Sequence, residues 1–279
     1  MLELLIPRTG VFIPAYQEPG LIDTIRSVGN QADLIVVVNN DADDEGLAAS
    51  PGVRELEAEW PHLHVITEPE KGTGTACDAG VRALLEREVE VVLRTDADTV
   101  VGEGWVGAAT RHLAENPGRQ LVYGTTLPRE DDGHFLEADR ELWDRFWPET
   151  RELAVQATGD LLYSHNVAGA NVAFRSTVYE QVQFPHVRIE DVDDDRRFAR
   201  GVWNLEADTP PEQRVGLGYE PSMVVYTSLR RIRALQKASA TPNDPEAGYN
   251  GLQAYYFVPE ADRAAKRAAM FLDARVDVR

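Results

Sequence analysis

The stretch Leu34-Ile35-Val36-Val37-Val38, followed directly by Asn39-Asn40-Asp41, decides the fold class. Five consecutive apolar residues predict a strand that is buried on both faces, which is typical of a parallel sheet covered by helices. The polar residues that follow mark the end of this strand. Ligand sites of open α/β sheets lie beyond the carboxyl ends of the strands, so this turn is a candidate site.

Strands and helices alternate on both sides of this stretch. The apolar runs predict strands at 11–13, 34–38, 64–67 and 90–93, and the helical spacing of apolar residues predicts helices at 19–28, 53–60 and 75–88. Four such alternations in about a hundred residues predict stacked βαβ units and a mostly parallel sheet flanked by helices.

Composition narrows the function classes. The chain has 279 residues, a formal net charge of −19 and one cysteine, Cys77. A chain this acidic repels phosphate backbones and anionic lipid surfaces, which argues against nucleic-acid and membrane binding. One cysteine excludes an internal disulfide, and we expect a buried, unreactive thiol. The sequence has no secretory signal and no apolar run of transmembrane length, so we expect a soluble, cytoplasmic protein.

Polar side chains follow each predicted strand of the first half. They are Tyr16, Glu18, Asn39 to Asp44, Lys71, Asp96 and Asp98. The carboxyl ends of parallel strands share one edge of the sheet, so carboxylates, amides and a lysine are expected together there.

The triplet Asp96-Ala97-Asp98 follows the fourth predicted strand. In an extended segment, side chains at i and i+2 point to the same side, and two close carboxylates repel unless a cation joins them. Mg²⁺ is commonly held by one or two carboxylates together with substrate phosphates. The triplet therefore indicates a metal–diphosphate site, and a solvated acidic turn is the alternative.

The segment Lys71-Gly72-Thr73-Gly74 precedes a predicted helix. Glycines at a helix start let backbone amides approach an anion. The third glycine of a dinucleotide fingerprint is missing at Cys77, and the phosphate-loop pattern is also missing. A plain loop before a helix explains this segment equally well.

Six motifs in order resemble glycosyltransferase family 2, a group of inverting, nucleotide-sugar-dependent enzymes with the GT-A fold. They are Val11-Phe12-Ile13-Pro14-Ala15-Tyr16-Gln17-Glu18, Val36-Val37-Val38-Asn39-Asn40-Asp41-Ala42-Asp43-Asp44, Lys71 to Gly80, Asp96-Ala97-Asp98, Gly169-Ala170-Asn171-Val172-Ala173-Phe174-Arg175, and Glu190-Asp191-Val192-Asp193 with Arg197. Each motif is loose, but their joint order is specific.

The resemblance implies an α/β fold of GT-A type and a role for each motif. The residues implied to bind the nucleotide sugar are Pro14, Tyr16, Glu18, Asn39, Asn40, Lys71, Asp78, Asp96, Arg230 and Arg231. Asp96 and Asp98 are implied to hold Mg²⁺ or Mn²⁺. Residues implied on the acceptor side are Gly169, Ala170, Asn171 and Glu190, and Asp191 is the implied base.

The same resemblance implies the domain organisation. We expect residues 1–240 to form the GT-A domain, with a nucleotide-sugar half at 1–125 and a smaller acceptor half at 126–240. Residues 241–279 are expected to form a turn-rich linker and a terminal helix. A long helix is predicted at 137–156, broken or kinked at Pro148.

The chain departs from the family pattern at four places. Asn39 and Asn40 stand where the nucleobase turn usually has aspartate, Asp78 replaces an asparagine, and Arg94 occupies a strand position that is normally apolar. Segment 224–227 lacks the histidine that some members use as a further metal ligand. An amide can still pair with a base edge, and UDP is the donor nucleotide that we expect.

Two other functions stay open at this point. A nucleotidyltransferase that makes nucleotide sugars shares the sheet and the metal carboxylates, but normally opens with a glycine-rich basic loop where this chain has Pro14-Ala15-Tyr16-Gln17-Glu18. The second open function is that of a degenerate family member that binds a nucleotide without catalysing a reaction. The acceptor is expected to be a small molecule or a glycan, and a homodimer is left open.

Overall fold

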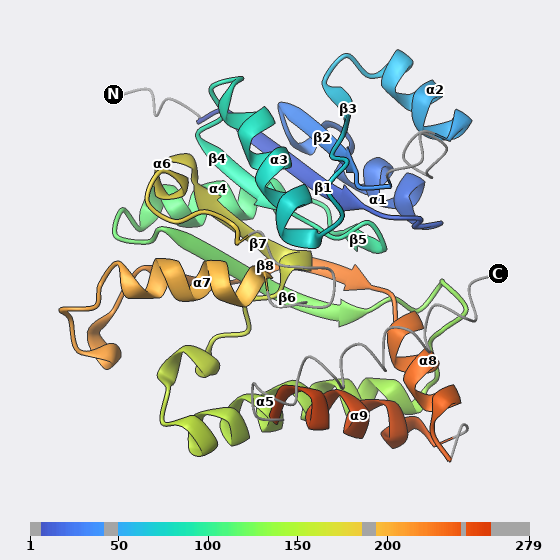
Figure 1. Cartoon of the computed structure of the whole chain (residues 1–279), viewed down its shortest axis with the longest axis vertical. Helices are drawn as coiled ribbons and strands as arrows, with labels where there is room; N and C mark the ends of the chain where they lie inside the picture. The colour runs from blue at the N-terminus through green and yellow to red at the C-terminus, as the bar shows by residue number, and fades with distance from the viewer. Residues whose placement is uncertain (1–6, 42–49, 186–193, 241–243, 258–279) are drawn as a thin grey trace. The chain divides into compact units, whose positions relative to one another are not determined.

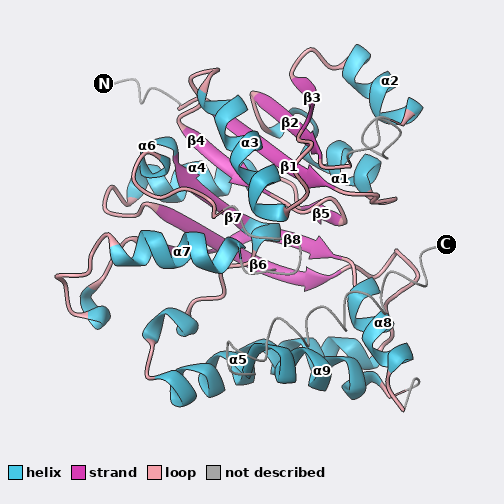
Figure 2. Cartoon of the chain, in the orientation of Figure 1, coloured by secondary structure: helices cyan, strands magenta, loops and turns pink. Residues whose placement is uncertain are grey.

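A computed structural model of the chain describes residues 7–41, 50–185, 194–240 and 244–257. Its strands are β1 (Thr9–Ala15), β2 (Leu34–Asn39), β3 (Leu63–Thr67), β4 (Val91–Arg94), β5 (Thr99–Val101), β6 (Leu121–Pro128), β7 (Val172–Arg175) and β8 (Leu217–Thr227). They form one sheet in the order β3-β2-β1-β4-β7-β6-β8-β5 (Figures 1 and 2).

The α-helices of this part of the chain are α1 (Leu21–Val28), α2 (Pro51–Glu59), α3 (Thr73–Leu85), α4 (Trp105–Glu115), α5 (Ala138–Thr158), α6 (Ser176–Tyr179), α7 (Asp194–Asn204), α8 (Arg230–Ala238) and α9 (Pro245–Phe257). Short 3₁₀ turns are η1 (Gly29–Gln31), η3 (Leu161–Ser164), η4 (Gly169–Asn171) and η5 (Pro211–Gln213).

The four strands predicted from the sequence form the parallel part of the sheet. β1 pairs in parallel with β2 and β4, and β2 pairs in parallel with β3, with Ala15 opposite Asn39 and Phe12 opposite Arg94. β7 then runs antiparallel to both β4 and β6. All six residues of β2 are buried, as a strand covered on both faces requires. The predicted α/β class is therefore confirmed.

Alternate side chains of β1 enter two different cores. Val11 and Ile13 belong to a core that also takes side chains from α1 and α4. Phe12 points to the other face, where a Cβ on Gly80 of α3 would lie 2.9 Å from its ring. The ring of Phe184 meets Phe12 edge-on, with centroids 6.0 Å apart. Helices thus cover both faces of the parallel strands.

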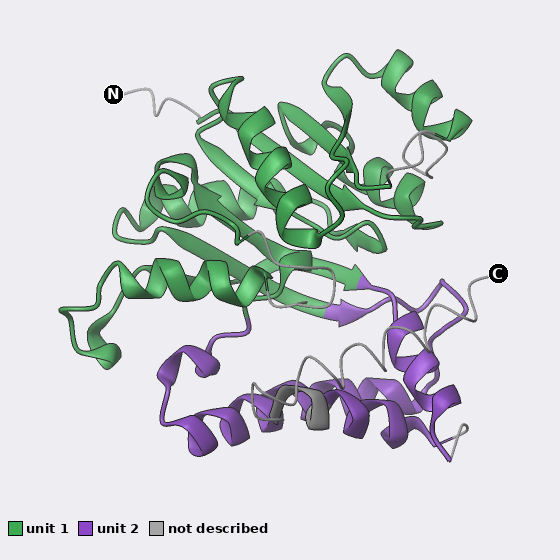
Figure 3. Cartoon of the chain, in the orientation of Figure 1, with its two compact units in different colours: residues 1–126, 167–226 green, residues 127–166, 227–279 purple. Residues whose placement is uncertain are grey.

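The chain divides into two compact units, each built from two stretches (Figure 3). Unit 1 comprises residues 1–126 and 167–226, and unit 2 comprises residues 127–166 and 227–279. The predicted halves, 1–125 and 126–240, are instead continuous stretches. Each unit combines segments that are distant in the sequence, because the chain passes from unit 1 to unit 2 near the ends of β6 and β8.

Unit 2 has its own core, formed by helices α5, α8 and α9. The buried side chains of this core are Leu142, Trp143, Phe146, Leu229, Ile232 and Tyr249. Trp147 packs against it, and its ring meets Trp143 edge-on at 5.6 Å between centroids. Arg233 of α8 forms an ion pair with the buried carboxylate of Asp139 in α5.

Three local predictions in unit 2 were wrong. α5 continues through Pro148 without a break, and Leu153, which the helical spacing of Leu142, Phe146 and Leu153 predicts to face inward, is exposed. Residues 245–257 form α9, which begins within the turn-rich linker predicted at 241–251, because Tyr249 packs into a core against α5. The terminal helix predicted at 262–275 lies outside the described residues.

No helix in the described part of the chain combines the length and the apolar character needed to cross a bilayer.

Candidate active site

The candidate site lies at the carboxyl edge of the parallel strands. β1, β2 and β4 run in the same direction, so the residues after Ala15, Asn39 and Arg94 emerge at one edge. Backbone bonds tie these ends together, since Asn40 N donates to Ala15 O at 2.9 Å. Among the described residues, the topology therefore brings the turns after β1, β2 and β4 to one edge, where the sequence predicts a polar cluster.

The turn after β1 carries Tyr16 and Glu18. Gln17 between them has a φ of 49°, a left-handed conformation that is uncommon for a residue other than glycine. Its side-chain amide donates to Asp41 Oδ2 at 2.9 Å, which joins the turns after β1 and β2. The Lys71 ammonium lies 5.5 Å from the ring centroid of Tyr16. An aromatic face and a lysine therefore stand together, a pairing suited to a base and an anionic group.

The Asn40 side chain is buried and fully engaged by the loop that carries Lys71. Its amide nitrogen donates to the carbonyls of Glu68 at 2.9 Å and Glu70 at 2.8 Å, and its oxygen accepts from Gly72 N at 2.9 Å. Asn39 accepts in turn from Asp41 N at 3.2 Å. Asn40 thus shapes this loop, whereas the sequence suggested that its amide faces a nucleobase.

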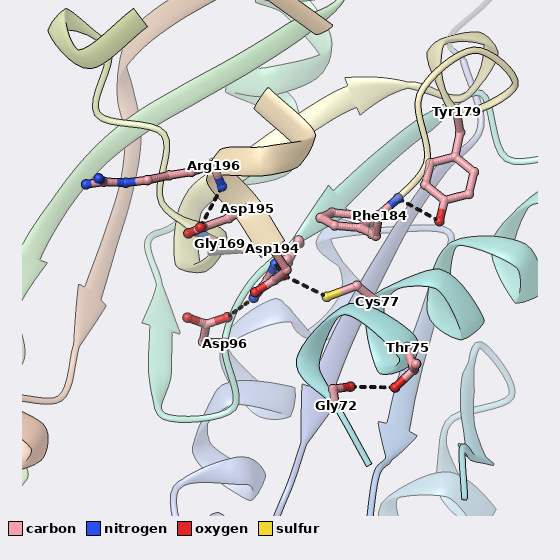
Figure 4. Close-up of polar contacts among 11 residues, drawn as sticks. Gly72, Thr75, Cys77, Asp96, Gly169, Tyr179, Phe184, Asp194, Asp195 and Arg196 are labelled. Carbon is pink, nitrogen blue, oxygen red and sulfur yellow. Dashed lines mark hydrogen bonds and ion pairs between the residues drawn. The ribbon is translucent and has the colours of Figure 1, made fainter. Parts of the chain in front are cut away.

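The loop ends where α3 begins. Thr75 Oγ1 donates to the carbonyls of Gly72 at 2.7 Å and Glu70 at 2.8 Å, which fixes the first turn of the helix (Figure 4). Asp78, one helical turn on, was expected to face the donor. Its carboxylate accepts instead from Tyr179 Oη at 2.5 Å and from Arg82 Nε at 2.8 Å. Burial and this hydrogen bond raise the pKa of Tyr179.

Asp96 and Asp98 flank a turn between β4 and β5. Thr99 N donates to Asp96 O at 3.1 Å, so the segment folds back and is not extended as the sequence suggested. Thr24 Oγ1 of α1 holds the turn by donating to Ala97 O at 2.8 Å. In the described residues, no group of three or more carboxylate, histidine or cysteine side chains could hold a metal ion. A metal at this turn would therefore need further ligands from phosphate or water.

Arg94 lies behind this turn, at the last position of β4. Its guanidinium donates through Nη1 to Asp194 Oδ2 at 2.5 Å and through Nη2 to Asp96 Oδ1 at 3.2 Å. Cys77 Sγ lies 3.5 Å from the same Asp194 oxygen (Figure 4). Burial alone would lower the pKa of Arg94, but the negative charges of Asp194 and Asp96 outweigh it and raise the pKa, so the group stays cationic. Burial also raises the pKa of the Cys77 thiol, which agrees with the predicted inert residue.

Asp195 is a half-buried carboxylate at the start of α7. It accepts from Gly169 N at 2.7 Å and from Arg196 N at 2.7 Å (Figure 4). Burial and the neighbouring charge of Asp194 raise the pKa of Asp195 to about 6, although the Arg94 and Arg196 guanidinium groups oppose the shift. A carboxylate with such a pKa at a sheet edge is suited to exchanging protons near neutral pH.

Asn171, predicted on the acceptor side, serves as a crosslink in unit 1. Its oxygen accepts from Trp105 Nε1 at 2.8 Å, and its nitrogen donates to the carbonyls of Thr125 and Met223, each at 2.9 Å. Gly169 and Ala170 in the same 3₁₀ turn are also buried. The structure places this segment beside Asp195 and so beside the acidic start of α7.

The sequence also selects Glu190, Asp191, Arg230 and Arg231 as site residues. Glu190 and Asp191 lie outside the described residues. Arg230 and Arg231 belong to the first turn of α8 in unit 2. Their predicted role toward the diphosphate stays a prediction.

Sequence reasoning missed Asp194 and Asp195 as participants. Both lay within a run of five acidic residues, and the run gave no sign of which of them would turn inward. The signal that could have found them is Phe198, four positions after Asp194, because an apolar residue at helical spacing predicts which face of α7 is buried. Arg94 was noticed only as an unusual residue in an apolar strand, and such a charge requires a buried partner.

Comparison with solved structures shows the fold. A mannosyltransferase from Pyrobaculum calidifontis in complex with GDP-Man and Mn²⁺ superposes with a TM-score of 0.57 at 19% identity, over 99% of this chain and 77% of that one. A glucosyl-3-phosphoglycerate synthase from Mycobacterium tuberculosis in complex with phosphoglyceric acid gives a TM-score of 0.49 at 15% identity, over 95% and 80%. The fold is the GT-A type that the motifs implied.

Comparison with family models gives the classification. A search of curated proteins finds no match. The model of Glycosyl transferase family 2 matches residues 10–182, which span more than half of the chain and include strands β1 to β4 and the turn at Asp96. The chain therefore belongs to glycosyl transferase family 2.

Proposed function

We propose that this enzyme transfers a sugar from a nucleoside-diphosphate sugar to an acceptor hydroxyl, with inversion at the anomeric carbon. The observation that carries the proposal is the match to the family over residues 10–182, the same stretch that gathers Tyr16, Lys71 and Asp96 at one sheet edge. UDP is the nucleotide that the sequence favours. The solved structure with the higher similarity holds GDP-Man, so GDP is the natural comparison.

The donor side of the site comprises the turns after β1, β2 and β3. Tyr16 offers a ring for the nucleobase, and Lys71 beside it offers a positive charge for the phosphates. Glu18 fixes the turn after β1, since its Oε1 accepts from Gly20 N at 3.1 Å, and Pro14 near the end of β1 is expected to line the site. We expect Asn40 to support binding indirectly, because it holds the loop that carries Lys71.

The residues at the turn after β4 fit a hard divalent cation, Mg²⁺ or Mn²⁺. Asp96 is 40% exposed and uses one oxygen for Arg94, so its second oxygen lies outside that contact. Asp98 is half-buried in the same turn. Two carboxylates suit such an ion when diphosphate oxygens complete its shell. When bound, the ion would offset the negative charge that develops on the departing nucleoside diphosphate.

On the acceptor side, a carboxylate would take the proton of the attacking hydroxyl. The hydroxyl oxygen bonds to the anomeric carbon as the bond from that carbon to the phosphate oxygen breaks, which inverts the configuration. Asp191 is the base that the family resemblance implies, and Glu190 and the 169–171 segment are expected to flank the acceptor. Asp195 accepts a hydrogen bond from Gly169 N, so a further carboxylate lies beside the predicted acceptor segment.

Isothermal calorimetry with UDP and GDP in Mn²⁺ tests the donor assignment. We expect the wild type to bind UDP more tightly than GDP. Asn40→Ala should weaken binding by about 1–2 kcal/mol, because it leaves Gly72 N unpaired and releases the loop at Lys71. Asn116→Ala, at the residue directly after α4, is a matched amide control that should leave binding unchanged. Absence of binding for both nucleotides would refute the proposal.

The nucleotidyltransferase alternative makes a different prediction with the same protein. That enzyme would consume a nucleoside triphosphate and a sugar phosphate and release pyrophosphate. The family match and the turn Ala15-Tyr16-Gln17 in place of a glycine-rich loop favour glycosyl transfer. Release of pyrophosphate from a triphosphate would reverse this preference.

A further inference from the structure

The Arg94 guanidinium contacts two carboxylates that differ in their exposure to solvent. Asp194, on Nη1, is 3% exposed, and the Arg94 side chain itself is 4% exposed. Asp96, on Nη2, is 40% exposed. One buried carboxylate is enough to compensate a buried guanidinium. The second contact, to a partly exposed group, adds little to stability by itself.

The second contact nevertheless fixes a geometry. Two Nη atoms of one planar group reach carboxylates that are 98 positions apart in the sequence, Asp96 and Asp194. Arg94 thereby orients the side chain that follows β4 and the first residue of α7 at the same time. A lysine could not reproduce this arrangement, because its charge is a single point.

The guanidinium is itself clamped by its surroundings. A Cβ on Gly169 would lie 2.4 Å from Arg94 Cζ, so this residue must be glycine for the group to keep its place. The ring of Phe184 lies on another side, with its centroid 5.7 Å from Cζ. Arg94 Nε is buried and has no hydrogen-bond partner. Leaving this donor unpaired costs free energy, which the other contacts of the guanidinium must offset.

We propose that Arg94 is a positioning residue, which holds Asp96 in the orientation that receives a divalent cation and its nucleoside diphosphate and couples that orientation to the start of α7. This inference rests on the proposed function and extends it to a residue that contacts no substrate. Groups that orient a metal ligand in this way change metal affinity roughly 10–100-fold when removed.

A paired apolar replacement separates positioning from simple charge compensation. Arg94→Met with Asp194→Leu removes the buried ion pair as a whole, which is often neutral or stabilising. We expect the double variant to unfold near the wild-type temperature but to bind UDP with Mn²⁺ roughly 10–100-fold more weakly by calorimetry. If Arg94 only compensates Asp194, the double variant recovers both stability and affinity, and the inference is overturned.

Gly169→Ala gives the second test and keeps every charge. The new methyl group displaces the guanidinium, so affinity for UDP with Mn²⁺ should fall in the same direction. Gly107→Ala in α4 is its control, since a Cβ there meets nothing within 4 Å. Unchanged affinity in Gly169→Ala would also overturn the inference. Failure of the wild type to bind either UDP or GDP is a separate outcome, which refutes the proposed function first and the role of Arg94 with it.

Discussion

Asp195 should give the protein a measurable dependence of stability on pH. Its pKa in the folded state is raised to about 6 from an ordinary value of 3.8, so between these values the folded chain holds more protons than the unfolded chain. The free energy of unfolding therefore falls as pH rises through this window. The Asp195→Asn variant has no carboxylate to titrate at this position. Relative to the wild type, its free energy of unfolding should therefore increase as pH rises from about 4 to 7.

Thermal unfolding of both proteins across this range measures the effect. The difference between their melting temperatures should grow with pH and level off above about pH 7. Glu212→Gln, in the 3₁₀ turn η5, is an exposed control that should show no such trend. A difference that stays constant from pH 4 to 7 would show that Asp195 titrates normally.

Asp191 and Asp195 make distinct kinetic predictions. As the implied base, Asp191 should lose turnover by ~10²–10⁴-fold on replacement by Asn, with donor affinity nearly unchanged, because asparagine cannot take the proton. Asp193→Asn should do far less. Asp194 is a poor control, since it is buried against Arg94. Comparable losses in Asp191→Asn and Asp193→Asn, or normal turnover in the former, would remove Asp191 from this role.

At this scale, the sequence predicted residue types better than it predicted contacts. The motifs selected Asn40, Asp78 and Asn171, and all three are buried polar residues. Their hydrogen bonds go to protein groups such as Gly72, Tyr179 and Trp105, which no local pattern reveals. These pairs are 32, 66 and 101 positions apart in the sequence, so they depend on the packing of whole elements.

Among the elements, the contact between α3 and β1 gives a sharp stability prediction. Gly80→Ala would place a methyl group 2.9 Å from the Phe12 side chain, at the packed contact between α3 and the sheet. Overpacking of this kind costs about 1–3 kcal/mol. Gly107→Ala in α4 has open space and should stabilise by up to about 1 kcal/mol, because alanine favours a helix. Urea unfolding of both variants tests this, and equal stabilities would contradict the described packing.

The elements also show what periodicity can and cannot predict. Strand β2 could be predicted, because a short continuous run of apolar residues is compatible with few structures other than a buried strand. The helix break predicted as one outcome at Pro148 did not occur, and α9 was missed, because both depend on packing within unit 2. The spacing of apolar residues in α9 is weak, so its packing against α5 and α8 stabilises it as a helix.

For the whole molecule, we expect the net charge of −19 to make the proposed donor binding depend on a cation. A nucleoside diphosphate is anionic and is repelled by the field of the protein, so a divalent ion should be needed to bring it to Asp96 and Asp98. UDP should raise the melting temperature only when Mn²⁺ is present, and EDTA should abolish the shift. At a hundredfold excess over Kd, the stabilisation is about 2.7 kcal/mol. An equal shift in EDTA would refute the metal site.

Release of nucleoside diphosphate from a panel of UDP- and GDP-sugars, with Mn²⁺ and mixed hydroxyl acceptors, tests the central claim most directly. The account predicts that the wild type releases UDP or GDP together with a glycosylated acceptor, and that Asp98→Ala, although folded, releases neither. Glu212→Gln should behave as the wild type. Equal release by Asp98→Ala, or release of pyrophosphate from a nucleoside triphosphate in place of any transfer, would contradict the account.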